Sequence, residues 1–267
     1  MKVFEFDSTA YLQRLHFSEK VLPTTEGLHT LQRAQFHNIP FENFDIQLGR
    51  GVDLDPANLF DKLVRRPRGG YCLELNGLLL MALRAFGFDA RPLLARVHLS
   101  GQPSGRGHQL SLVNVEGRQW LVDVGFGKNN PRGPYLLERD TIQDISGKYI
   151  RLVDGGVFGN MLQARSEEGW QNLYSFDMEH VCQGDINYGA HYTSTNSNSF
   201  FTTSRVAMKP LEDGMVTLFN NRLTLFRDGQ ENEIQLPEGQ EYMDALKTYF
   251  GIELDAPYEA LRSVDRE

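Results

Sequence analysis

The segment Arg68-Gly69-Gly70-Tyr71-Cys72-Leu73-Glu74-Leu75-Asn76 is a loop rich in helix breakers that opens into an apolar helix. The apolar run continues to Phe86, and Gly87 is a typical helix stop. Cys72 is therefore predicted in the first helical turn, where free N–H groups and the helix dipole stabilise a thiolate. The glycines permit a tight turn and close approach of a substrate to the backbone. Cys72 is a candidate nucleophile, and the alternative is a small buried hydrophobic residue.

The sequence pattern changes on either side of this segment. Upstream, apolar residues recur at helical spacing, as in Tyr11-Leu12-Leu15 and from Leu28 to Phe36. Downstream of Gly87 the pattern indicates strands, followed from Phe200 by further strands and a last helix from about Tyr242 to Phe250. The expected strands are 93–99, 109–115, 119–126, 149–153, 161–164, 170–176, 215–219 and 223–226. Helices followed by strands and a mixed tail predict an α+β fold.

His108 and Asp123 are the candidate partners of Cys72. If strands 109–115 and 119–126 form a hairpin in which Val115 pairs with Arg118, Asp123 lies opposite Leu110. His108 is then two residues further along on the same face, within reach of an Asp–His hydrogen bond. A cysteine with such a pair matches the logic of acyl transfer. The alternatives are a loop-end histidine on the surface and an acid that caps a strand end.

Composition narrows the classes of partner and compartment. The chain has 267 residues, 40% of them hydrophobic, and a formal net charge of −8. This charge argues against nucleic acid and an anionic membrane surface as partners. Two cysteines, with no Cys/His cluster, predict no metal site and no disulfide framework, and favour a reduced, cytoplasmic compartment. Cys182 is expected to be a packing residue.

Several segments strongly resemble the arylamine N-acetyltransferases. They are the Cys72 segment, Ile39-Pro40-Phe41-Glu42-Asn43-Phe44, Gly107-His108-Gln109-Leu110, Leu121-Val122-Asp123-Val124-Gly125-Phe126-Gly127, and Tyr192-Thr193-Ser194-Thr195 with Phe201. They occur in the family's order and span most of the chain. One departure is Ser197, where family members often have proline.

The resemblance implies three domains: a helical bundle over 1–88 that carries Cys72, a β-barrel over 89–199 that carries His108 and Asp123, and an α/β lid over 200–267. It implies a Cys-His-Asp core like that of cysteine proteases and ping-pong transfer from acetyl-CoA, a co-substrate, to an aromatic amine, hydrazine or hydrazide. By resemblance, Ser104, Gly105, Tyr192, Asn198 and Phe201 lie near coenzyme A. Phe126 and Phe201 are candidates to line an apolar amine pocket.

Three rival functions remain open at the level of sequence. An amide synthase of the same family would close a macrolactam from a carrier-bound acyl chain. A Cys-His-Asp thioester hydrolase would pass the acyl group to water. A non-catalytic member would only bind ligands. The sequence carries no signal for the oligomeric state or for the physiological amine.

Overall fold

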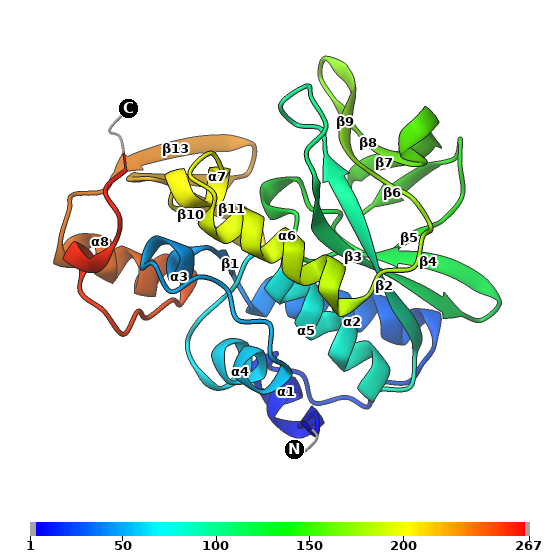
Figure 1. Cartoon of the computed structure of the whole chain (residues 1–267), viewed down its shortest axis with the longest axis horizontal. Helices are drawn as coiled ribbons and strands as arrows, with labels where there is room; N and C mark the ends of the chain where they lie inside the picture. The colour runs from blue at the N-terminus through cyan, green and yellow to red at the C-terminus, as the bar shows by residue number, and fades with distance from the viewer. Residues whose placement is uncertain (1–3, 265–267) are drawn as a thin grey trace.

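The computed structural model describes residues 4–264 and has an α+β fold (Figure 1). Helices dominate the first third of the chain. They are α1 (Ser8–Arg14), α2 (Thr25–Asn38), α3 (Phe44–Gln47), α4 (Pro56–Phe60), a π-helical turn (Asp61–Arg65) and α5 (Cys72–Ala85). None of the helices within residues 4–264 has the length and hydrophobicity needed to cross a membrane.

A strongly curved, nearly closed antiparallel sheet of eight strands fills the middle of the chain. Its order is β5-β4-β3-β2-β9-β8-β7-β6. The strands are β2 (Asp89–Val97), β3 (Arg106–Val115), β4 (Arg118–Val122), β5 (Tyr135–Leu136), β6 (Ile142–Ile145), β7 (Lys148–Asp154), β8 (Asn160–Ser166) and β9 (Gly169–Phe176).

Both faces of β3 are buried, which places this strand at the centre of the molecule. Leu110 and Leu112 pack inside the curved sheet with residues of β7, β8 and β9. Val113 and Val115 point the other way, into a core shared with α2 and α5. Alternating side chains of one strand therefore join the helical core to the sheet interior. This arrangement brings the amino end of α5 against the sheet.

A second sheet contains strands from both ends of the chain. Its order is β1-β10-β11-β12-β13, with all neighbours antiparallel. The strands are β1 (Phe41–Glu42), β10 (Val206–Leu211), β11 (Gly214–Phe219), β12 (Arg222–Arg227) and β13 (Gln230–Gln235). Its core includes α8 (Gln240–Ala245) with its extension Leu246–Phe250, and Phe44 from the first part of the chain.

One expected strand is shorter in the structure, and one long helix was not expected. Strand 119–126 ends earlier, at Val122, because the following residues turn away to meet α5. Helix α6 (Gln183–Thr195) was not predicted; it crosses the molecule between the two sheets and is followed by α7 (Phe200–Thr203) (Figure 1). Its buried positions Ile186, Ala190 and Ser194 recur every four residues but include only one large apolar side chain, so the helical period is weak.

Candidate active site

Cys72 is the first residue of α5 and is buried. The start of this helix is fixed by the Glu74 carboxylate, which accepts a 3.1 Å hydrogen bond from the Tyr71 amide. The thiol Sγ lies 3.7 Å from the carbonyl oxygen of Gly107. The structure thus places the thiol against the backbone of the residue that precedes His108.

A buried network of charged side chains holds the loop before Cys72. The Arg68 guanidinium is only 3% exposed and pairs with Glu42 at 2.9 Å and with Asp45 at 3.0 Å. The Lys62 ammonium bridges Asp45 at 2.6 Å and Glu74 at 2.7 Å. Breaking such a buried pair on one side leaves an uncompensated charge, which is strongly destabilising. The network therefore fixes the path of the chain into the helix that carries Cys72.

The β3–β4 hairpin has the predicted register. Val115 pairs with Arg118, and Ser111 pairs with Val122. The two-residue turn has positive φ at both Glu116 and Gly117, which is the conformation that matches the twist of a hairpin. The structure places His108 Nε2 2.7 Å from Asp123 Oδ2, with both side chains buried.

Asp123 is held by two groups that the sequence reasoning missed. The Asn76 amide nitrogen donates to Asp123 Oδ1 at 2.9 Å, and the Gly125 amide donates to the same oxygen at 2.8 Å. Asn76 follows Cys72 by four residues, so both face the same side of α5. That spacing is a signal from which Asn76 could have been found.

Gly125 is required by the close approach of the two parts of the site. A Cβ atom there would lie 2.7 Å from the Cα of Cys72 and 2.8 Å from Asn76 Nδ2. Real Cβ atoms do not approach other atoms so closely. Glycine therefore lets the segment after β4 lie directly on the first turn of α5.

Burial and local charge act in opposite directions on the acid of the site. Burial by itself raises the pKa of Asp123, but His108 and the hydrogen bonds from Asn76 and Gly125 outweigh it and hold the pKa below its usual range. Asp123 is therefore a carboxylate at neutral pH, suited to orient the histidine ring.

The Cys72 thiol is also subject to opposing effects. Burial raises its pKa, and the charge of Asp123 raises it further. Hydrogen bonds from the amides of Leu73 and Cys72, at the free end of α5, lower it. The helix end thus favours the thiolate as the sequence suggested, but burial outweighs it when no cation is close.

Aromatic rings enclose the pair from the sheet side. The rings of Phe126 and Tyr174 have centroids 4.9 Å and 5.1 Å from that of His108. Tyr174 is buried, and its hydroxyl lies 2.8 Å from that of Tyr135. Phe201 instead packs against Tyr71 at 5.3 Å. Phe126 and Phe201 thus flank the site from different elements, and within residues 4–264 no ring contact joins them.

The residues expected near coenzyme A lie on two neighbouring segments. Ser104 and Gly105 are exposed in the loop before β3, where Ser104 Oγ accepts a 2.8 Å hydrogen bond from the Val97 amide. Tyr192 on α6 is 55% exposed, and Asn198 is exposed in the turn between α6 and α7. Helix α6 packs on β3 beside Gly107, so the two segments are adjacent.

Cys182, expected to be a packing residue, is exposed. It is the N-cap of α6, and its amide donates to Asp185 at 2.9 Å. That expectation was wrong: the capping position holds the side chain at the helix end, outside the core.

Comparisons with known proteins agree with one another. An N-acetyltransferase family model matches residues 24–258. The chain is 38% identical to an arylamine N-acetyltransferase / N-hydroxyarylamine O-acetyltransferase of Salmonella typhimurium, over 91% of this chain and 88% of that protein. It is 37% identical to an arylamine N-acetyltransferase of Mycobacterium tuberculosis, over 92% of this chain and 89% of that protein.

Solved structures give the same result. The arylamine N-acetyltransferase of Salmonella typhimurium superposes with a TM-score of 0.88 at 37% identity, covering 92% of this chain and 90% of that one. The Mycobacterium marinum enzyme in complex with CoA superposes with a TM-score of 0.86 at 36% identity, covering 92% and 93%. Fold and sequence therefore agree, and the chain belongs to the arylamine N-acetyltransferase family.

Proposed function

We propose that this acetyl-transferring enzyme moves the acetyl group of acetyl-CoA through Cys72 to the nitrogen of an aromatic amine, hydrazine or hydrazide. The observation that carries the proposal is the 2.7 Å contact between His108 and Asp123 beside the Cys72 thiol at the start of α5. A Mycobacterium marinum relative has been solved with CoA, which supports acetyl-CoA as the donor.

In the first half-reaction, Cys72 attacks the carbonyl carbon of the thioester. A carbon–sulfur bond forms to Cys72, the bond to CoA sulfur breaks, and the departing sulfur takes a proton from His108. The oxyanion that forms in between is stabilised by backbone amides at the start of α5, with that of Cys72 as the first candidate. In the second half-reaction the amine nitrogen attacks the carbonyl carbon of acetyl-Cys72, a carbon–nitrogen bond forms, the bond to Cys72 sulfur breaks to give back the thiolate, and the nitrogen gives its proton to His108.

The thiolate requires a nearby cation, because burial and Asp123 both raise the pKa of the thiol. A protonated His108, held by Asp123, supplies that charge at the point where the thiol lies against Gly107. We propose that Cys72 and His108 rest as a thiolate–imidazolium pair.

We assign donor binding to Ser104, Gly105, Tyr192, Asn198 and Phe201. Their support is the adjacency of the loop before β3 and α6: Gly189 and Thr193 of α6 lie against Gly107, and Tyr192 is exposed on the same helix. Phe126, against His108, and Phe201, against Tyr71, are proposed to line the amine pocket.

The proposed domains are 1–88, 89–199 and 200–267, the last acting as a lid. Two of the three hydrophobic clusters support this division, one inside the eight-stranded sheet and one on the five-stranded sheet, whereas the first joins the helices to residues of β2, β3 and β4. The cytoplasmic location inferred from cysteine usage stays a prediction.

The test is release of CoA from acetyl-CoA with and without an arylamine such as an aniline. Amine-dependent release is expected, and Cys72→Ser abolishes it because a hydroxyl is far less acidic than a thiol. Cys182→Ser is the matched control and keeps most of the activity, since Cys182 is exposed on another helix. Equal release in both tubes would favour the hydrolase, and no acetyl-enzyme would favour the synthase or the binder.

A further inference from the structure

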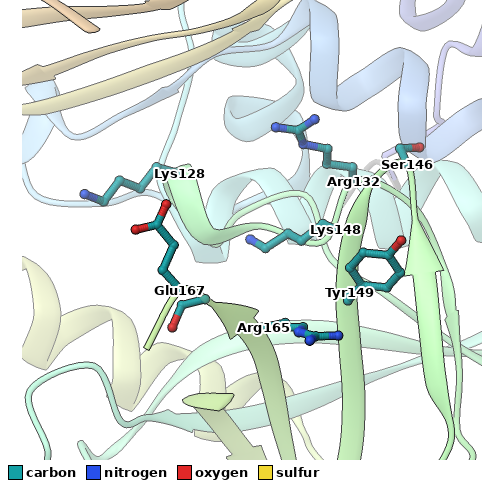
Figure 2. Close-up of a pocket in the computed structure, with 9 residues that line it drawn as sticks. Lys128, Arg132, Ser146, Lys148, Tyr149, Arg165 and Glu167 are labelled. Atoms are coloured by element: carbon teal, nitrogen blue, oxygen red, sulfur yellow. The ribbon is translucent and has the colours of Figure 1, made fainter. Parts of the chain in front are cut away.

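A basic cavity of about 560 Å³ lies at one end of the eight-stranded sheet. It is formed by three segments: the loop after β4, the β6–β7 turn and the β8–β9 turn (Figure 2). Its lining residues are Lys128, Arg132, Ser146, Gly147, Lys148, Tyr149, Arg165, Ser166 and Glu167. None of the residues assigned above to the thiol chemistry, donor or acceptor lines it.

The charge of this cavity is unlike that of the whole chain. Its lining includes four cationic side chains, from Lys128, Arg132, Lys148 and Arg165, and one carboxylate, from Glu167, although the chain carries a net charge of −8. Among residues 4–264, none of the four cations forms an ion pair. An excess of cations without carboxylate partners in a concave site is a feature of anion recognition.

Lys148 is the least solvent-exposed of the four cationic side chains. Its ammonium donates to the carbonyl oxygens of Asn129 at 2.6 Å and of Asn130 at 3.4 Å. Burial and the charge of Arg132 lower the pKa of Lys148 to about 8, although the charge of Asp123 raises it. Lys128, Arg165, Glu167 and the Tyr149 hydroxyl are the other titratable groups that line the same space. A negative charge in the cavity would relieve this repulsion.

We propose that this cavity is a second ligand site, which binds an anion bearing phosphate and carrying at least two negative charges. Two guanidinium groups match the fork geometry of phosphate oxygens, and two ammonium groups add point charges. The excess of cations favours a multiply charged ligand over a single carboxylate. The half-exposed ring of Tyr149 at the edge provides a flat surface for a group attached to the phosphate.

The probe is inorganic pyrophosphate, titrated by calorimetry into protein near pH 8, with and without saturating CoA. Binding is expected in both cases, because the cavity shares no residue with the proposed donor site. Binding should also take up a fraction of a proton, because Lys148 is only partly protonated at this pH. Heats measured in two buffers of different ionisation enthalpy report this uptake.

Four variants separate a built site from diffuse attraction. Lys148→Met and Arg165→Gln should each weaken binding by about tenfold or more, as expected for loss of a charge-assisted contact. Lys148→Arg should keep binding but lose proton uptake, because arginine does not titrate in this range. Lys247→Gln, which removes an exposed charge near Glu253, is the matched control and should change binding less than about twofold.

Arg165 is exposed at a hairpin end, so its variant should fold even if Lys148→Met does not. No measurable binding by wild-type protein would overturn the proposal, as would equal weakening by Lys247→Gln. Displacement of pyrophosphate by CoA would also overturn it as a second site. None of these outcomes affects amine-dependent CoA release, so the acetyl-transfer proposal is judged separately.

Discussion

The Asn76 side chain, one helical turn after Cys72, donates a 2.9 Å hydrogen bond to the carboxylate of Asp123. The same amide nitrogen donates to the Gln109 carbonyl at 2.6 Å, and the amide oxygen accepts from Val124 N at 3.0 Å. One side chain thus ties the helix of the nucleophile to β3 and to the segment that follows β4. It acts on the chemistry through the position of Asp123.

Asn76→Ala should slow acetylation of Cys72 by about 10–100-fold and lower the free energy of unfolding by about 1–3 kcal/mol, since it leaves buried polar groups unpaired. The apparent KM for acetyl-CoA should change little, because Asn76 is buried behind the thiol. Single-turnover acetylation and urea unfolding measure the two effects. Asn58→Ala, on the exposed side of α4, is the control and should behave as wild type. A normal acetylation rate in Asn76→Ala would show that Asp123 is positioned without it.

Asp123→Asn should reduce the acetylation rate by orders of magnitude. The amide keeps the shape of the carboxylate but removes the charge that orients the His108 ring and stabilises its charged form. The buried partners of Asp123 remain in place, so the protein should stay folded and its thermal unfolding midpoint should change little. Near-normal acetylation would remove Asp123 from the mechanism.

Gly125→Ala should lower activity by at least about tenfold, because the new Cβ would lie 2.7 Å from the Cα of Cys72 and force the two segments apart. Gly184→Ala on α6 is the matched control. A Cβ there meets only Cys182 Sγ at 3.5 Å, and alanine favours the helix. The measurement is the ratio of kcat/KM between the two variants. Equal activities would mean that the site tolerates the displacement of the segment after β4 from α5.

The ionisation of Cys72 can be followed by its rate of alkylation with iodoacetamide across pH, in Cys182→Ser protein. Burial without a nearby cation would raise the thiol pKa, so the alkylation rate would rise only above pH 8.5, which is about the pKa of an ordinary cysteine. The proposed ion pair with His108 should instead give substantial reactivity well below pH 7. His108→Gln should lose this acidic shoulder, since the remaining contributions of burial and Asp123 raise the thiol pKa. A single alkaline rise, unchanged in His108→Gln, would mean that His108 removes the proton only during attack.

Lys148 should make stability depend on alkaline pH. Its folded pKa of about 8 lies below that of an unfolded lysine, so the unfolded chain binds more protons between about pH 8 and pH 10. Stability from this group therefore rises with pH across that window, by at most about 1.4 kcal/mol per unit. Urea unfolding of Lys148→Met should lack this rise relative to wild type, whereas Lys247→Gln should keep it. Parallel curves for wild type and Lys148→Met would contradict the shift.

The hairpin could be predicted from sequence because its geometry is local. Glu116 and Gly117 form a two-residue turn, and an even loop fixes which side chains share a face. This is enough to bring His108 to Asp123. The contacts of Asn76 and Gly125 could not be predicted in the same way, since they depend on how α5 docks against the sheet. The basic cavity gave no sequence signal for a related reason: its cations come from three turns that meet only in the folded chain.

The two-residue strand β1 has a consequence for how the chain can be divided. Phe41 pairs with Met208 on one side and bridges Gly70 on the other, next to the loop of the nucleophile. The C-terminal sheet is thus completed by a strand that the first part of the chain donates. A fragment that ends before β10 would leave the β1 backbone without its neighbouring strand. Because β1 also bridges Gly70, which precedes Cys72 by two residues, this loss would lie next to the nucleophile. The C-terminal region therefore cannot be exchanged by itself. Replacing it with the corresponding region of a relative requires that relative's β1 segment as well.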